Sequence, residues 1–142
     1  MSWRSALPIR PKNMAGAALV DSNVFIALTR RDEDVAQWLG GQLDDIYTCG
    51  IVRLEVLRGI KDPRQRDEMA SFFNVLCNVP TDNKLWDQAA ELGWELDRRG
   101  LIIPGPDILI ASCALRAGVP VITADKHFDD IPGLVVIPFP GR

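Results

Sequence analysis

The chain has 142 residues, of which 47% are hydrophobic and 25% charged, and its 16 basic and 19 acidic residues give a net charge of −3. This is the composition of one globular domain of ordinary size. The acidic balance excludes binding to nucleic acid through bulk positive charge. No apolar run reaches the roughly 18–20 residues of a membrane span. We therefore expect a soluble, cytoplasmic protein without membrane contact and without a signal peptide.

The first 13 residues contain three basic residues, two prolines and no acidic residue. This composition is typical of a flexible basic extension, so we expect one domain over residues 14–142. Met14 stands just before the first predicted strand, and both Met1 and Met14 are candidate start sites. The cysteines Cys49, Cys77 and Cys113 are far apart in apolar segments, which indicates buried core thiols and neither a disulfide framework nor a zinc site.

Predicted strands and helices alternate along the chain. The apolar run at 17–20 predicts a buried strand, and Ser22 begins a short apolar helix after it. Further strands are predicted at 46–48, 75–79, 119–123 and 134–138, and helices at 32–40, 51–58, 63–74, 81–99 and 106–118. This alternation favours an α/β fold, a three-layer α/β/α sandwich around a parallel sheet. We take the strand order as 3-2-1-4-5, the doubly wound arrangement.

The long helix predicted at 81–99 is amphipathic and ends at Gly100. Its apolar stripe predicts the face that packs on the rest of the domain, and Trp86 and Trp94 lie beside that stripe. We expect these tryptophans in the core or on a dimer surface. The stripe comprises Leu85, Ala89, Leu92 and Leu96.

Four acidic residues are expected at one edge of the predicted sheet. Asp21 ends the first strand and Asp125 follows the fourth, so in this strand order both lie at the crevice where α/β proteins bind ligands. Asp107 lies in the first turn of a later helix, and that helix begins at the same edge of the sheet. Glu55 follows Leu54 at the margin of an apolar helix. The simpler explanations remain open at this point: Asp21 as a helix cap and Glu55 as a solvent-exposed side chain.

Four carboxylates in one crevice repel one another strongly. At about 5 Å and an effective dielectric constant near 20, each pair costs roughly 3 kcal/mol. Either some of the acids are protonated or a cation lies among them. Ligation by oxygen atoms alone suits Mg²⁺ or Mn²⁺. Such a site is equipped to activate water and to stabilise charge on a phosphodiester under attack.

Four short segments resemble the PIN domain, and most closely its VapC-type ribonuclease toxins. The segments are LVDSN, LEVLRG, PDILIASCA and ITADKHF, which occur in the family's order between residues 17 and 138. The resemblance implies Mg²⁺- or Mn²⁺-dependent endoribonuclease cleavage of RNA, with tRNA or another structured RNA as a plausible substrate. It also implies a homodimer and a cognate antitoxin. The family's acidic positions fall on Asp21, Glu55, Asp107 and Asp125, and its supporting polar positions on Asn23 and Thr123.

Three basic residues lie near these acids in the sequence and are candidates for contacts with RNA phosphates. They are Arg58, Lys126 and His127, although each is more commonly a plain surface charge. His127 is the sole histidine of the chain. RNA cleavage by a histidine acid–base pair without metal is therefore excluded.

Other functions fit the sequence less well. A signalling receiver needs a phosphoacceptor aspartate about 30 residues after Asp21, where the chain has Thr48 to Gly50. A haloacid-dehalogenase-like phosphatase needs an aspartate at the position of Asn23. The chain has no glycine-rich phosphate loop. A catalytically weak module of the same fold that binds RNA or protein remains the alternative to a nuclease.

Overall fold

The computed structural model describes residues 16–30 and 32–139. The predicted extension at 1–13 and Met14 lie outside these residues. The elements are β1 (Ala17–Val20), α1 (Ser22–Thr29), α2 (Glu33–Gln42), β2 (Asp45–Thr48), α3 (Gly50–Arg58), α4 (Pro63–Asn74), β3 (Cys77–Asn78), α5 (Asn83–Arg98), α6 (Gly105–Ala117), β4 (Val121–Thr123), the 3₁₀ helix η2 (Lys126–Asp130) and β5 (Val136–Pro138).

The five strands form one parallel sheet in the order β3-β2-β1-β4-β5. The predicted fold class and strand order are thus confirmed. β1 lies at the centre, with Leu19 opposite Tyr47 of β2 and Val121 of β4. Because parallel strands end at one edge of the sheet, the residues after β1, β2 and β4 meet there.

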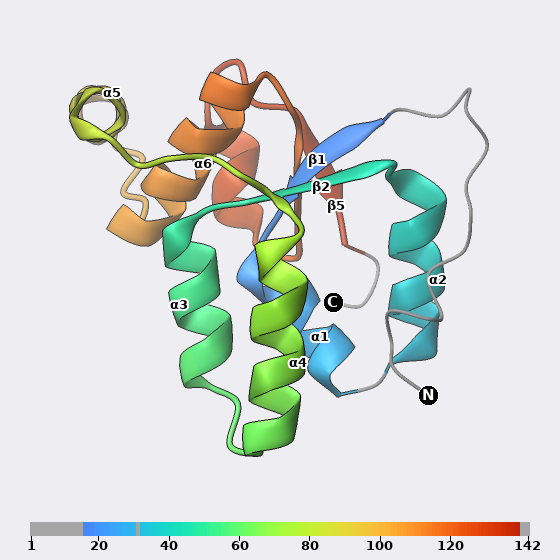
Figure 1. Cartoon of the computed structure of the whole chain (residues 1–142). Helices are drawn as coiled ribbons and strands as arrows, with labels where there is room; N and C mark the ends of the chain where they lie inside the picture. The colour runs from blue at the N-terminus through green and yellow to red at the C-terminus, as the bar shows by residue number, and fades with distance from the viewer. Residues whose placement is uncertain (1–15, 31, 140–142) are drawn as a thin grey trace.

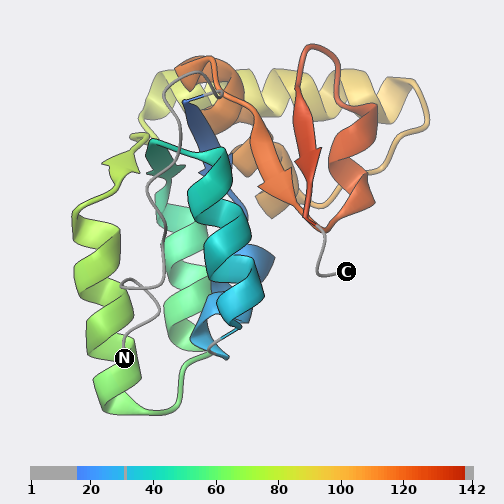
Figure 2. The same ribbon diagram turned by 90° about the vertical axis from the view of Figure 1, so that its right-hand side faces the viewer.

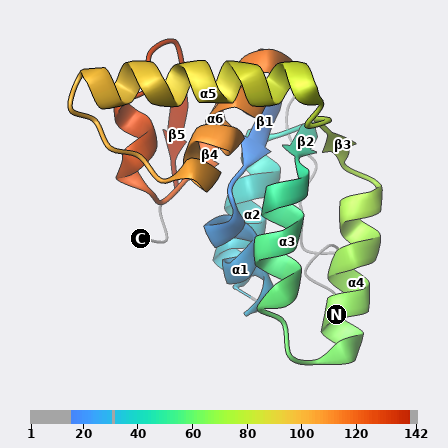
Figure 3. The ribbon, with the colours of Figure 1, turned by 90° about the vertical axis from the view of Figure 1, so that its left-hand side faces the viewer.

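Helices pack on one another and on the sheet. α3 lies beside α1 and α4, and α5 lies along α6 (Figures 1 and 3). Turning the molecule shows β4 and β5 side by side, with the η2 segment between β4 and β5 in the chain (Figure 2). α6 contacts α3, β1 and η2, so it connects the central strand with the elements that follow β2 and β4.

Local sequence explains where most helices begin and end. The carboxylates of Asp32, Asp62 and Asp82 accept backbone N–H groups of the helices that follow them, as N-caps do. Gly118 ends α6 in the left-handed conformation, at φ 68°. One predicted stop was wrong, because α2 continues through Gly40 and Gly41 to Gln42.

Close packing of α5 on α6 depends on Gly93. A Cβ atom at this position would lie 3.2 Å from Cδ1 of Ile108. The predicted stripe of α5 faces inward: Leu85, Ala89 and Leu96 are buried, and Leu92 is partly buried. The core also contains a cluster of aromatic rings, in which the centroid of Phe25 lies 4.9 Å from that of Phe73.

Some side chains that the sequence placed inside are exposed. Trp86 and Trp94 are 52% and 57% exposed, which rules out the core for both and leaves the dimer surface as a prediction. Leu54, which the apolar pattern of the predicted helix at 51–58 favours as an inward position, is also exposed, because α3 buries Val52 and Val56 instead. The prediction of buried thiols holds for Cys49 and Cys113, but Cys77 lies exposed on the short strand β3.

None of the helices within residues 16–30 and 32–139 is both long enough and apolar enough to cross a bilayer.

Candidate active site

The site is built at the carboxyl edge of the sheet. Asp21 follows β1 and is the N-cap of α1, and Asp125 follows β4 and is the N-cap of η2. Asp107 lies in the first turn of α6, which begins at this edge, and Glu55 lies in α3. The structure therefore brings together acids that are separated by up to 104 positions in the sequence.

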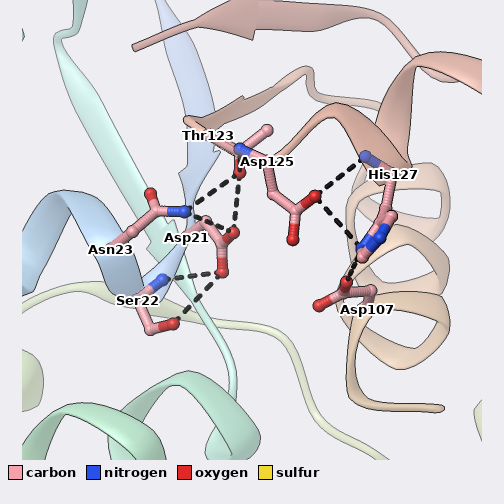
Figure 4. Close-up of polar contacts among 7 residues, drawn as sticks. All are labelled: Asp21, Ser22, Asn23, Asp107, Thr123, Asp125 and His127. Atoms are coloured by element: carbon pink, nitrogen blue, oxygen red, sulfur yellow. Dashed lines mark hydrogen bonds and ion pairs between the residues drawn. The ribbon is translucent and has the colours of Figure 1, made fainter. Parts of the chain in front are cut away.

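Asp21 is held by hydrogen bonds on both carboxylate oxygens. Its Oδ1 accepts the backbone N–H of Ser22 at 2.7 Å, and its Oδ2 accepts the hydroxyl of Thr123 at 2.7 Å and the amide of Asn23 at 3.2 Å (Figure 4). It is therefore both a helix cap and a member of the acidic cluster. The two explanations for this residue are not alternatives.

Thr123 and Asn23 connect the two strand ends. Thr123 Oγ1 accepts the backbone N–H of Asp125 at 2.9 Å while it donates to Asp21, and Asn23 Oδ1 accepts the N–H of Ala124 at 3.3 Å. Thr123 is fully buried. One network thus fixes the positions of both Asp21 and Asp125.

Glu55 extends the cluster on the side of α3. Burial raises the pKa of its carboxyl, as does the charge of Asp21, while a hydrogen bond from Ser22 lowers it and the charge of Asp107 raises it further. The side chain is half-buried. Free exposure of Glu55 to solvent, the simpler sequence explanation, is therefore wrong.

The carboxyl groups of Asp21 and Asp107 also have raised pKa values. For Asp21 burial is the main cause, and its hydrogen bond from Thr123 acts in the opposite direction. For Asp107 burial again raises the pKa, the hydrogen bond with His127 lowers it, and the charges of Asp125 and Asp21 raise it. Burial and, after it, the charges of the neighbouring acids therefore raise the pKa values of three carboxyl groups in one place, as is common at functional sites.

His127 lies against the acids. Its Nδ1 is 3.1 Å from Asp107 Oδ2 and 3.1 Å from Asp125 Oδ1. The hydrogen bond with Asp107 and the charge of Asp125 raise the pKa of the imidazole. The sequence placed His127 among possible RNA contacts and assumed oxygen ligands alone. The two-residue spacing of Asp125 and His127 was missed in the sequence. An aspartate at this spacing can be the N-cap of the turn that carries the histidine.

Ser22 also has a larger role than the sequence indicated. Its backbone N–H holds Asp21, and its hydroxyl lies 3.4 Å from the same Oδ1 and bonds to Glu55. Arg58 and Lys126, the other basic candidates, are exposed at the end of α3 and the start of η2. Their contacts with RNA remain a prediction.

Beside the cluster, two buried thiols contact each other. Cys49 precedes α3 and Cys113 lies in α6. A hydrogen bond between them lowers the pKa of Cys49 and raises that of Cys113. This contact joins two of the helices that carry acids of the site.

Comparison with known proteins identifies the family. A family model described as the PIN domain matches residues 18–134, so the chain belongs to the PIN domain family. It is similar to Ribonuclease VapC1 of Methanocaldococcus jannaschii, with 28% identity over 112 residues and 78% of each protein covered. The resemblance that the four sequence segments indicated is thus confirmed.

Solved structures share the fold. A chain of VapBC2 from Rickettsia felis, bound to a promoter DNA fragment, superposes with a TM-score of 0.73 at 24% identity, over 86% of this chain and 98% of that one. A toxin-antitoxin complex from Klebsiella pneumoniae gives a TM-score of 0.70 at 24% identity, over 83% and 95%.

Proposed function

We propose that this protein is a divalent-metal-dependent endoribonuclease that acts as the toxin of a toxin-antitoxin pair. The observation that carries the proposal is the meeting of Asp21, Glu55, Asp107 and Asp125 at one edge of a PIN fold. The similarity to a VapC ribonuclease supports the activity. The similarity to a toxin-antitoxin complex supports the biological role.

The residues present fit a divalent cation. Asp107, Asp125 and His127 each offer a ligand atom, and these atoms lie within 4.8 Å of one another. Carboxylate oxygens suit Mg²⁺ and Mn²⁺, and the repulsion among the acids, which contributes to their raised pKa values, supports a cation between them. Asp21, Asp107 and Asp125 would hold the ion, with Glu55 beside it.

A bound cation would stabilise the charge that develops on the scissile phosphodiester and would lower the pKa of a coordinated water. The protein's own contribution is to fix the ligands. Asp21 keeps its orientation through Ser22 and Thr123, and Asp125 through the hydrogen bond of its N–H to Thr123. Glu55 would accept a hydrogen bond from the attacking water and orient it.

RNA would enter over the exposed rim of the site. Arg58 and Lys126 are the proposed phosphate contacts, and they supply locally the positive charge that the chain as a whole lacks. We also propose a cognate antitoxin and a homodimer. The exposed face of α5 that carries Trp86 and Trp94 is the proposed dimer contact, because a second copy packed there would bury the apolar surface of both rings.

The test is incubation of the purified protein with total RNA in Mg²⁺, in Mn²⁺ and in chelator. Asp21→Asn and Glu55→Gln should reduce cleavage at least about a hundredfold, and chelator should abolish it. Asp67→Asn is the matched control, because Asp67 is an exposed acid of α4. Cleavage that survives chelator, or an Asp21→Asn protein as active as wild type, would refute the proposal. Binding of RNA without cleavage would identify a catalytically weak module.

A further inference from the structure

His127 has its ring nitrogen directed at the acidic cluster. Nδ1 lies 3.1 Å from one oxygen of Asp107 and 3.1 Å from one oxygen of Asp125 (Figure 4). The three candidate ligand atoms of these residues lie within 4.8 Å of one another, so a single ion can contact all three.

The backbone fixes this arrangement. The N–H of His127 donates to Asp125 Oδ1 at 2.9 Å, and the neighbouring Phe128 is fully buried. The turn η2 is therefore anchored on both sides of the histidine. The side chain itself is half exposed, so an ion from solvent can reach the ring.

A nitrogen ligand changes which ions the site prefers. Mg²⁺ favours oxygen ligands and keeps its own water, whereas imidazole is a good ligand for first-row transition metals. A site of carboxylates alone would discriminate little in favour of Mn²⁺. One imidazole added to the carboxylates shifts the balance towards Mn²⁺ and the later ions of the series.

We propose that His127 is a metal ligand through Nδ1 and makes the site selective for a transition-metal ion, with Mn²⁺ preferred over Mg²⁺. The inference rests on the proposed function, because it concerns the same metal centre. It assigns to His127 a role beyond that of the four acids, and it specifies the class of ion.

Calorimetric titration of the full chain with MnCl₂ and with MgCl₂ measures the preference. His127→Ala should weaken Mn²⁺ binding by about tenfold or more and change Mg²⁺ binding by less than about threefold. His127→Asp, which supplies oxygen, should bind Mg²⁺ at least as well as wild type. Asp130→Asn is the matched control for local charge, because Asp130 is an exposed acid of the same turn.

Pulsed electron paramagnetic resonance of the Mn²⁺-loaded protein tests the ligand directly. Modulation from a coordinated ¹⁴N nucleus should be present in wild type and in Asp130→Asn, and absent in His127→Ala. Mn²⁺ binding without nitrogen coupling, unchanged by His127→Ala, would overturn the inference and leave the nuclease proposal intact. Nitrogen coupling in a protein that cleaves no RNA would support the inference and refute the nuclease. Failure to bind either ion would overturn both.

Discussion

Replacement of Asp107 by asparagine should affect the metal-free and metal-loaded proteins in opposite directions. The ligand atoms of Asp107 and Asp125 lie within 4.8 Å of each other. Two unit charges at this distance repel by about 1 kcal/mol at the dielectric constant of water and by about 3.5 kcal/mol at an effective value of 20. Asp107→Asn removes this repulsion, and the amide oxygen can still accept a hydrogen bond from His127.

Two smaller losses oppose this gain. Asp107 lies in the first turn of α6, where a negative charge interacts favourably with the helix dipole by about 0.3–1 kcal/mol, and its charge also attracts His127. We therefore expect the free energy of unfolding of the metal-free variant to equal that of wild type or exceed it by up to about 1 kcal/mol. A purely structural aspartate would give a clear loss.

With metal the order should reverse. At Mn²⁺ a hundredfold above its dissociation constant, wild type gains about 2.7 kcal/mol, which for a chain of this size raises Tm by about 8–10 °C. If the variant binds 10–100-fold more weakly, the same Mn²⁺ concentration stabilises it by only about 0.4–1.4 kcal/mol. Differential scanning calorimetry at pH 8, with and without Mn²⁺, measures both quantities.

Asp67→Asn is again the control and should leave both quantities unchanged, since Asp67 is exposed on α4. Two results would contradict the reasoning: a loss of more than about 2 kcal/mol in metal-free Asp107→Asn, or a stabilisation by Mn²⁺ as large as that of wild type. The first would mean that the acid serves the fold, and the second that the ion binds elsewhere.

Further measurements test other parts of the structure. Thr123→Val should lower the free energy of unfolding by about 1–3 kcal/mol in urea titrations, because the part-buried N–H of Asp125 and the buried carboxylate of Asp21 lose their partner, while Thr123→Ser should lose much less. In the native protein a thiol reagent should label Cys77 quickly and the two buried thiols only after unfolding. Serine at both Trp86 and Trp94 should shift the sedimentation coefficient towards the monomer. Because burial raises the pKa of three site acids, the folded metal-free chain holds protons more tightly than the unfolded chain, so its stability should fall as pH rises from about 4 through the raised values.

The order of strands was predictable because alternating elements leave few ways to build a parallel sheet. The residues at which each strand begins and ends were harder to predict. The segment 75–79 has the composition of a strand, yet the N–H groups of Val75 and Leu76 bond to the carbonyls of Phe72 and Phe73 at the end of α4. Residues whose N–H groups complete the hydrogen bonds of a helix end are not available to the strand that follows. Apolar composition does not distinguish such residues from strand residues.

The sequence also did not predict which face of the short helix α3 is buried. α3 has nine residues, and its apolar side chains occur on more than one face. Packing against α1, α4 and α6 selects Val52 and Val56 and leaves Leu54 exposed. That choice also decides the position of Glu55, which lies next to the buried Val56 and comes within reach of Asp21. Tertiary contacts thus converted an apparently exposed acid into a member of the cluster.

The convergence of the acids followed from topology, whereas the place of His127 follows from local geometry that no periodicity reveals. Asp21 and Asp125 end adjacent parallel strands, so the strand order alone brings them together. His127 reaches the same cluster because Asp125 accepts its N–H within a 3₁₀ turn and thereby directs the ring towards Asp107. The position of His127 therefore depends on the hydrogen bond between residues 125 and 127 and on the burial of the neighbouring Phe128. The ion preference of this site can therefore differ from that of a relative with the same four acids and another residue at this position.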